Sequence, residues 1–182
     1  MSHGAQASGH ATGAAPRALA PLARMLDAIN RLVLTVGMFA LLGAAAILTY
    51  SVLSRYFFKS ATDWQDEASV FLLVGATFLC GAYVQSYRGH IGIEALSSLL
   101  PAAVNRIRVL LVDLLTLAFC AFFAWKSWTL FHEAWVEHHT SSSSWAPPLS
   151  IPYGLMAAGM TLLTLQVLLQ TMIQFAWIRS RR

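Results

Sequence analysis

The stretch LVLTVGMFALLGAAAILTYSVL, residues 32–53, carries no charged side chain. A run of about 20 apolar residues is long enough to cross the hydrocarbon core of a bilayer as a helix. Three further apolar stretches of similar length follow, at about 68–87, 108–131 and 151–178. We therefore predict an all-α membrane protein with four transmembrane helices.

The composition of the 182-residue chain agrees with this prediction. Charged residues make up 11% and hydrophobic residues 57%, with a mean hydropathy of +0.60, whereas soluble domains are usually about 25% charged. Four spans leave no contiguous room for a soluble catalytic domain, so we expect no enzyme. The basic residues stand at the ends of apolar runs rather than in a stripe with aromatics, which excludes nucleic acid as a partner.

The segments outside the spans have a different character. Residues 1–23 are rich in Ala, Gly, Ser and Pro and predict a disordered tail, while residues 24–182 form a single transmembrane domain. Apolar residues at steps of three or four over residues 19–33 predict a short amphipathic helix before the first span, whose arginines suit lipid headgroups. A similar pattern over residues 91–107 predicts a second helix lying on the bilayer.

The distribution of positive charge predicts the orientation, because cytoplasmic segments carry the excess of Lys and Arg. With four spans, nine of the basic residues fall on one side and three on the other. We therefore expect both termini in the cytoplasm. The larger group is Arg17, Arg24, Arg31, Arg88, Arg106, Arg108, Arg179, Arg181 and Arg182, and the smaller is Arg55, Lys59 and Lys126.

The histidines and cysteines predict no cofactor and no metal. A b-type haem would need histidine pairs on facing helices inside the membrane, but His90 lies at an inner helix end, His138 and His139 are in a loop, and the others lie in the tail or at the outer boundary. Cys80 and Cys120 are far apart in the sequence, without a C-x-x-C spacing.

Few ionisable residues fall within the spans. Asp113 lies some 6 Å past the inner start of the third span at 1.5 Å per residue, and we expect it to pair with Arg106 or Arg108. Lys126 lies near the outer end of the same span and can snorkel. A self-sufficient transporter would need ionisable or polar groups near the bilayer midplane.

Three amides recur on one face of the fourth span, at Gln166, Gln170 and Gln174. Such side chains prefer another polar helix to lipid. Their partners lie either within this bundle or in a partner subunit, and the sequence favours neither. Small residues at four-residue spacing, such as Ala76 and Cys80, indicate sites where helices can approach closely.

Opposite charges flank the outer loop between the first two spans. Arg55 follows the first span and Glu67 precedes the second, so we expect an ion pair that closes this hairpin. Trp64 stands beside them as an interfacial anchor.

Taken in order, several short motifs are similar to the small membrane subunit of tripartite ATP-independent periplasmic (TRAP) transporters. They are Arg55-Tyr56, Trp64, Glu67, Gly81-Ala82, Arg88-Gly89-His90-Ile91 and Pro101, followed by Pro148-Leu149-Ser150-Ile151-Pro152, Gly159 and Leu165-Gln166. The resemblance is strongest over residues 48–101 and covers 145–170 less closely. The long tail and the His138-His139 loop depart from the family pattern.

The resemblance implies an ion-coupled secondary transporter of the bacterial inner membrane for organic anions such as carboxylates. In that family a periplasmic solute-binding protein captures the solute and a large membrane subunit moves it, commonly with sodium. The small subunit is a membrane scaffold without a known substrate site. The alternative reading of the four-span plan is a membrane anchor for a respiratory oxidoreductase, which a haem absorption band would reveal.

Overall fold

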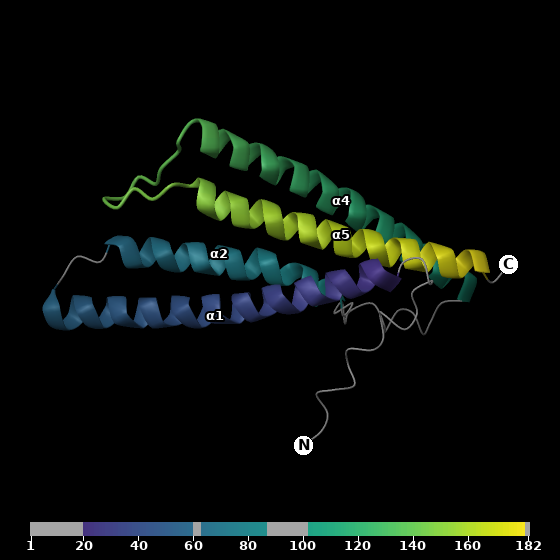
Figure 1. Cartoon of the computed structure of the whole chain (residues 1–182), viewed down its shortest axis with the longest axis horizontal. Coiled ribbons are helices and arrows are strands. Elements are labelled where there is room, and N and C mark those ends of the chain that lie inside the picture. Colours follow the sequence, from purple (N-terminus) through teal and green to yellow (C-terminus); the bar gives the residue numbers. More distant parts are fainter. Residues whose placement is uncertain (1–19, 60–62, 87–101, 181–182) are drawn as a thin grey trace, which may run out of the picture.

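A computed structural model of the chain describes residues 20–59, 63–86 and 102–180 (Figure 1). These described residues form four helices, α1 (Ala20–Phe58), α2 (Asp63–Ser86), α4 (Ala102–Val136) and α5 (Ser150–Ser180). Each is long and apolar enough to cross a membrane. The described residues form no strand, and their one isolated β-bridge joins Thr140 to Pro148. The prediction of an all-α protein with four transmembrane helices is confirmed.

The helices extend beyond the apolar runs that predicted them. The expected short helix over residues 19–33 is continuous with the first span, because α1 runs unbroken for 39 residues, about 58 Å. Residues 102–107, expected in a helix on the bilayer surface, are instead the first turns of α4. Residues 20–23, predicted to belong to the disordered tail, are instead the first turn of α1. The rest of the predicted tail, residues 1–19, and the segment 91–101 lie outside the described residues.

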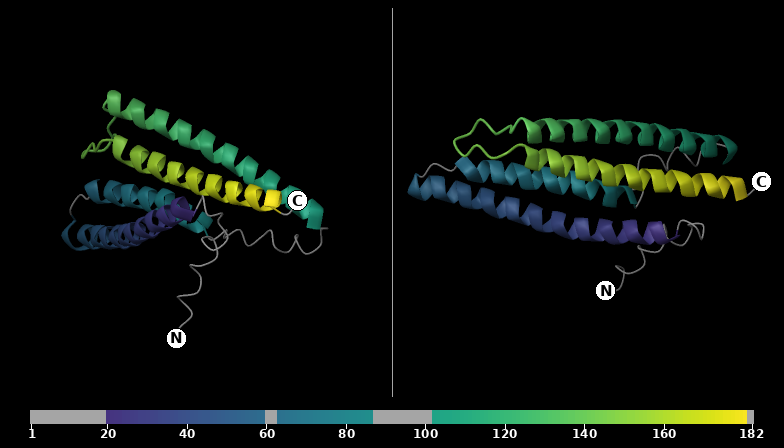
Figure 2. Two further views of the ribbon diagram at one scale, coloured as in Figure 1. Left: turned by 45° about the vertical axis from the view of Figure 1, so that its right-hand side comes forward. Right: turned by 45° about the horizontal axis from the view of Figure 1, so that its top comes forward.

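The helices stand side by side in the order α1, α2, α5, α4 (Figures 1 and 2). We call the end where α1 leads to α2 and α4 leads to α5 the hairpin end, and the opposite end the terminal end. At the terminal end α1 reaches α5, because Ala23 and Leu26 pack against Leu169 and Ile173. Among the four spans α5 is the most buried, and it lies with α2 in the interior of the array.

Helix α1 faces its neighbours with a seam of small or polar residues spaced seven apart. Ala23, Asn30, Gly37, Ala44 and Ser51 are all buried. A seven-residue repeat keeps one face of a helix on its neighbour over many turns. At the middle of this seam a Cβ on Gly37 would lie 2.3 Å from the Cys80 Sγ, so α1 and α2 approach closely here, as the small residues Ala76 and Cys80 indicated.

The contact of α2 with α5 is equally close. A Cβ on Gly159 would lie 2.5 Å from the carbonyl carbon and oxygen of Phe78, and one on Gly75 would lie 3.1 Å from the Leu155 side chain. Lipid supplies no hydrophobic force between helices, so close packing of this kind carries much of the association.

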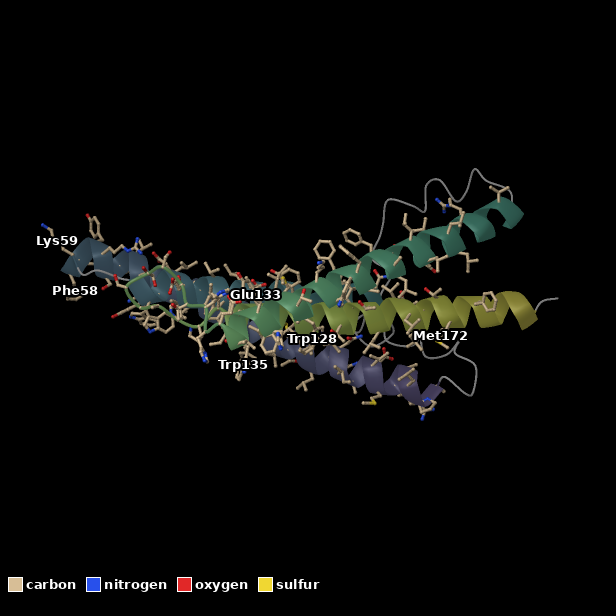
Figure 3. All side chains as sticks on the ribbon, turned by 90° about the horizontal axis from the view of Figure 1, so that it is seen from above. Phe58, Lys59, Trp128, Glu133, Trp135 and Met172 are labelled. Atoms are coloured by element: carbon tan, nitrogen blue, oxygen red, sulfur yellow. The ribbon has the colours of Figure 1, made fainter. Side chains whose placement is uncertain are left out.

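Helix α4 packs only partly against α5. Cys120 and Ala124 form a small core with Met160, and the Trp128 Nε1 donates a hydrogen bond of 3.0 Å to the Thr161 Oγ1. Toward the terminal end α4 diverges from α5 (Figure 3). The outward side of α4 is therefore a broad exposed edge of the array.

Candidate functional site

The polar side chains of the bundle gather at its two ends. At the hairpin end, Arg55 of α1 forms an ion pair with Asp66 of α2. The Ser51 Oγ donates a second hydrogen bond to the same carboxylate, at 3.4 Å. The side chains of Arg55 and Asp66 are 52% and 53% exposed, so this pair contributes at most about 1 kcal/mol.

The partner predicted for Arg55 was Glu67, and the structure corrects this to Asp66. Successive residues of a helix are rotated by about 100°, so these neighbouring carboxylates face different elements. Asp66 faces α1, whereas Glu67 faces the connection between α4 and α5, where its Oε1 accepts a hydrogen bond from the Ser141 hydroxyl. The Glu67 Oε2 is buried and has no hydrogen-bond partner among the described residues.

The connection that holds Ser141 is a narrow, hydrogen-bonded loop. The Ser141 N–H donates to the Pro147 carbonyl at 3.0 Å, and the Leu149 N–H donates to the His139 carbonyl at 2.9 Å. These bonds turn the Ser141 hydroxyl toward α2. Residue Ala146 occupies the left-handed region with φ of 46°, which costs an L-residue about 1–2 kcal/mol.

At the terminal end, amide pairs join α5 to both of its partners in the α1–α2 hairpin. The Asn30 Nδ2 donates to the Gln166 Oε1 at 3.0 Å. The Gln85 Nε2 donates to the Gln170 Oε1 at 3.0 Å, and the Gln170 Nε2 donates to the Gln85 carbonyl at 2.9 Å. All four side chains are buried. For Gln166 and Gln170 the structure thus selects partners within the bundle.

The other predicted residues have these positions. Trp64 lies exposed at the start of α2. Asp113 is half-buried in the terminal-end third of α4, and its pairing with Arg106 or Arg108 stays a prediction. The side chain of Gln174 lies outside the described residues, as do Arg88 and His90 entirely.

Sequence reasoning missed Asn30, Gln85 and Ser141 as bonding partners. Asn30 and Gln85 sit near the terminal ends of two uncharged runs, at the same depth as the predicted glutamines, and this shared depth is a usable signal. Ser141 is one of four consecutive serines, so composition alone does not single it out.

This arrangement binds helices to one another. No three His, Cys, Asp or Glu residues of the described chain are grouped so that they could hold a metal ion. His139 pairs with Glu137 at 2.8 Å in the exposed loop. The amides of Asn30, Gln85, Gln166 and Gln170 are committed to α1–α5 and α2–α5 contacts, so they help to fix which helices are neighbours.

Comparison with known proteins gives two matches. Residues 44–176, well over half of the chain, match the family described as tripartite ATP-independent periplasmic transporters, DctQ component. The chain is also 27% identical over 158 residues to the C4-dicarboxylate TRAP transporter small permease protein DctQ of Vibrio cholerae serotype O1. That alignment covers 75% of this chain and 66% of the relative, slightly under two thirds of its length. No solved structure matches the chain.

Both matches describe a transporter component and not an enzyme, and neither supports the respiratory anchor. Together with the four apolar helices, they identify a multi-pass protein of the bacterial inner membrane. The resemblance read from the short motifs is confirmed over most of the transmembrane domain. The chain belongs to the DctQ component family of tripartite ATP-independent periplasmic transporters.

Proposed function

We propose that this chain is a scaffold subunit that supports transport without carrying the solute. It acts with a large membrane subunit and a periplasmic solute-binding protein in the uptake of organic anions. The name of the Vibrio cholerae relative suggests C4-dicarboxylates as the solute class. An ion gradient, commonly sodium in this family, drives the transport.

This proposal rests on the hydrogen bonds that the buried amides of the spans make between helices. A transporter that binds its solute at the midplane needs polar groups directed into a cavity. Here Asn30 bonds to Gln166 and Gln85 bonds to Gln170, each pair across a contact between two helices. These four buried amides thus hold the helices of the scaffold together.

The orientation adds a role for the hairpin end. With both termini in the cytoplasm, the Glu67–Ser141 contact and the ordered α4–α5 loop would face the periplasm. Trp135 and Trp145 are exposed there, and Figure 3 shows both Glu133 and Trp135 at this end of α4. We propose that this surface helps to receive the solute-binding protein.

Reconstitution tests the proposal. Proteoliposomes that contain the large subunit and this chain, supplied with the binding protein and a sodium gradient, should accumulate labelled succinate. Vesicles with this chain alone should accumulate none. Accumulation by this chain alone would refute a scaffold role, and full uptake without this chain would show that the scaffold is dispensable.

A further inference from the structure

Lys126 is a cation on the outward edge of α4 for which the described part of the bundle offers no carboxylate. Its side chain is exposed, and no Asp or Glu of the described residues lies within ion-pair distance of it. The Nζ instead lies 5.4 Å from the ring centroid of Trp125, the preceding residue. A cation over an exposed aromatic ring gains about 0.5–1 kcal/mol, which does not offset the cost of a charge inside a bilayer, about 2.5–3.5 kcal/mol.

The packing of α4 shows how deep this cation lies. On one side of it along α4, Phe131 contacts the Gly154 position of α5. On the other side, Cys120 and Ala124 pack with Met160. Lys126 is therefore level with the part of α5 between residues 154 and 160. Gly159, within that part, packs on Phe78 near the middle of the apolar run of α2.

The Lys126 ammonium group lies too deep for its side chain to reach the membrane surface by the snorkelling that the sequence predicted. Phe78 is eleven residues along α2 from the charged residue Glu67, about 16 Å along the helix axis. The four-carbon stem of lysine covers less than half of that distance. Helical side chains also lean toward the N-terminus of their helix, which for α4 is the terminal end, so Lys126 leans away from the nearer polar cluster at the hairpin end.

The residues around Lys126 form a regular stripe along α4. They recur at steps of three or four, as on the contact face of a helix that packs along its length with another, and all are exposed. Large aromatic side chains of this kind dominate well-packed interfaces. The α4 stripe consists of Leu115, Phe119, Phe122, Lys126, Thr129 and Glu133.

We propose that the α4 stripe docks on a transmembrane helix of the large membrane subunit that presents a carboxylate opposite Lys126. This inference rests on the proposed function, since it names the surface by which the scaffold meets its partner. A lipid phosphate is disfavoured by the depth of the ammonium group. A second copy of this chain is disfavoured too, because a two-fold contact between equally oriented copies would set Lys126 against its own counterpart.

Copurification with a matched control tests the proposal. The tagged chain is coexpressed with the large subunit, and the copurified large subunit is quantified for wild type, Lys126→Met and Lys59→Met. Methionine keeps the length of the stem, and Lys59 is an exposed lysine at the hairpin end of α1. We expect a loss of about thirtyfold or more for Lys126→Met, as for the removal of one partner of a buried charge pair, and no loss for Lys59→Met.

Two further measurements separate docking from misfolding and from lipid contact. The thermal midpoint of isolated Lys126→Met should equal or exceed that of wild type, because the substitution removes a charge from an exposed, lipid-facing position of α4. A photocrosslinker at Phe122 should capture the large subunit, and one at Phe39, 70% exposed on the opposite edge, should not.

Unchanged copurification of Lys126→Met, or a crosslink from Phe122 to lipid or to a second copy alone, would overturn the docking proposal while leaving the scaffold role standing. A wild-type chain that captures no large subunit would refute the scaffold role and the docking surface together.

Discussion

Gly159 is the residue whose side-chain size bears most directly on the contact between α2 and α5. A Cβ there would lie 2.5 Å from the carbonyl atoms of Phe78, and backbone atoms cannot turn aside as a side-chain end can. We expect Gly159→Ala to destabilise the protein by about 1–3 kcal/mol through overpacking. The thermal midpoint in detergent, followed by tryptophan fluorescence, measures this loss.

Gly81 is the control for that substitution. A Cβ on Gly81 would meet nothing within 4 Å, and alanine is the better helix former by about 1 kcal/mol. Gly81→Ala should therefore leave the midpoint unchanged or raise it. A common response of both variants would contradict the close approach at Gly159.

The carboxylates at the start of α2 should differ in their coupling to Arg55. Asp66 pairs with it at half exposure, so a double-mutant cycle between Arg55 and Asp66 should give about 0.2–1 kcal/mol. The Arg55→Asp and Asp66→Arg exchange should recover stability that either single reversal loses. The same exchange with Glu67→Arg should recover none, and recovery there would restore the pairing first expected from the sequence.

Charge patterns alone could place these side chains at one depth but could not select between them. Arg55, Asp66 and Glu67 all fall at the hairpin end because charges end apolar runs. The choice of partner depends on the rotation of α2, which the contacts of Gly75 and Phe78 with α5 fix further along the helix. The rotation of α2 is thus determined by residues along its whole contact with α5, and the charged residues at the hairpin end do not reveal it.

Among the elements, the pairing of α1 with α5 combines the apolar contacts of Ala23 and Leu26 with the hydrogen bond between Asn30 and Gln166. We expect Asn30→Leu or Gln166→Leu alone to cost about 1–3 kcal/mol, since each leaves a buried amide unpaired. The double variant should cost less than the sum, with a coupling of about 0.6–1.7 kcal/mol. Thermal or chemical unfolding of the single and double variants in bicelles gives these values.

A polar residue on an exposed face serves as the control for this cycle. Thr77 is exposed on α2, so Thr77→Val should leave stability nearly unchanged. Additive costs for Asn30→Leu and Gln166→Leu would show that the two amides act independently, and the contact would then not fix the order of the helices.

The sequence predicts the four spans well and their ends less well, for a physical reason. An apolar run marks the part of a helix that hydrocarbon surrounds, whereas backbone hydrogen bonding continues through headgroup-level residues. Helix α1 therefore begins at Ala20 and α4 at Ala102, before their apolar runs. The seven-residue seam from Ala23 to Ser51 is present in the sequence as a repeat of small or polar residues. A search for apolar periodicity does not detect it, because its members are not large apolar residues.

For the whole molecule, the prediction of spans from hydropathy does not give the order α1, α2, α5, α4 in which the helices stand. Hydropathy fixes how many helices cross the membrane, while their neighbours follow from close contacts such as Gly37 with Cys80 and Gly159 with Phe78. An open row also leaves an edge on α4 that a closed bundle would bury. This edge is consistent with a subunit whose surface is completed by another protein.

The orientation of the whole array in the membrane stays a prediction that labelling can decide. In a background with Cys80→Ala and Cys120→Ala, single cysteines are placed at Ser144, exposed in the α4–α5 loop, and at Met25, 62% exposed at the terminal end of α1. Neither substitution changes the charge count on which the orientation rests. A membrane-impermeant maleimide added to spheroplasts should label the cysteine at position 144 at once and the one at position 25 only after permeabilisation. The reverse pattern would place the hairpin end in the cytoplasm, where it could not meet a periplasmic binding protein.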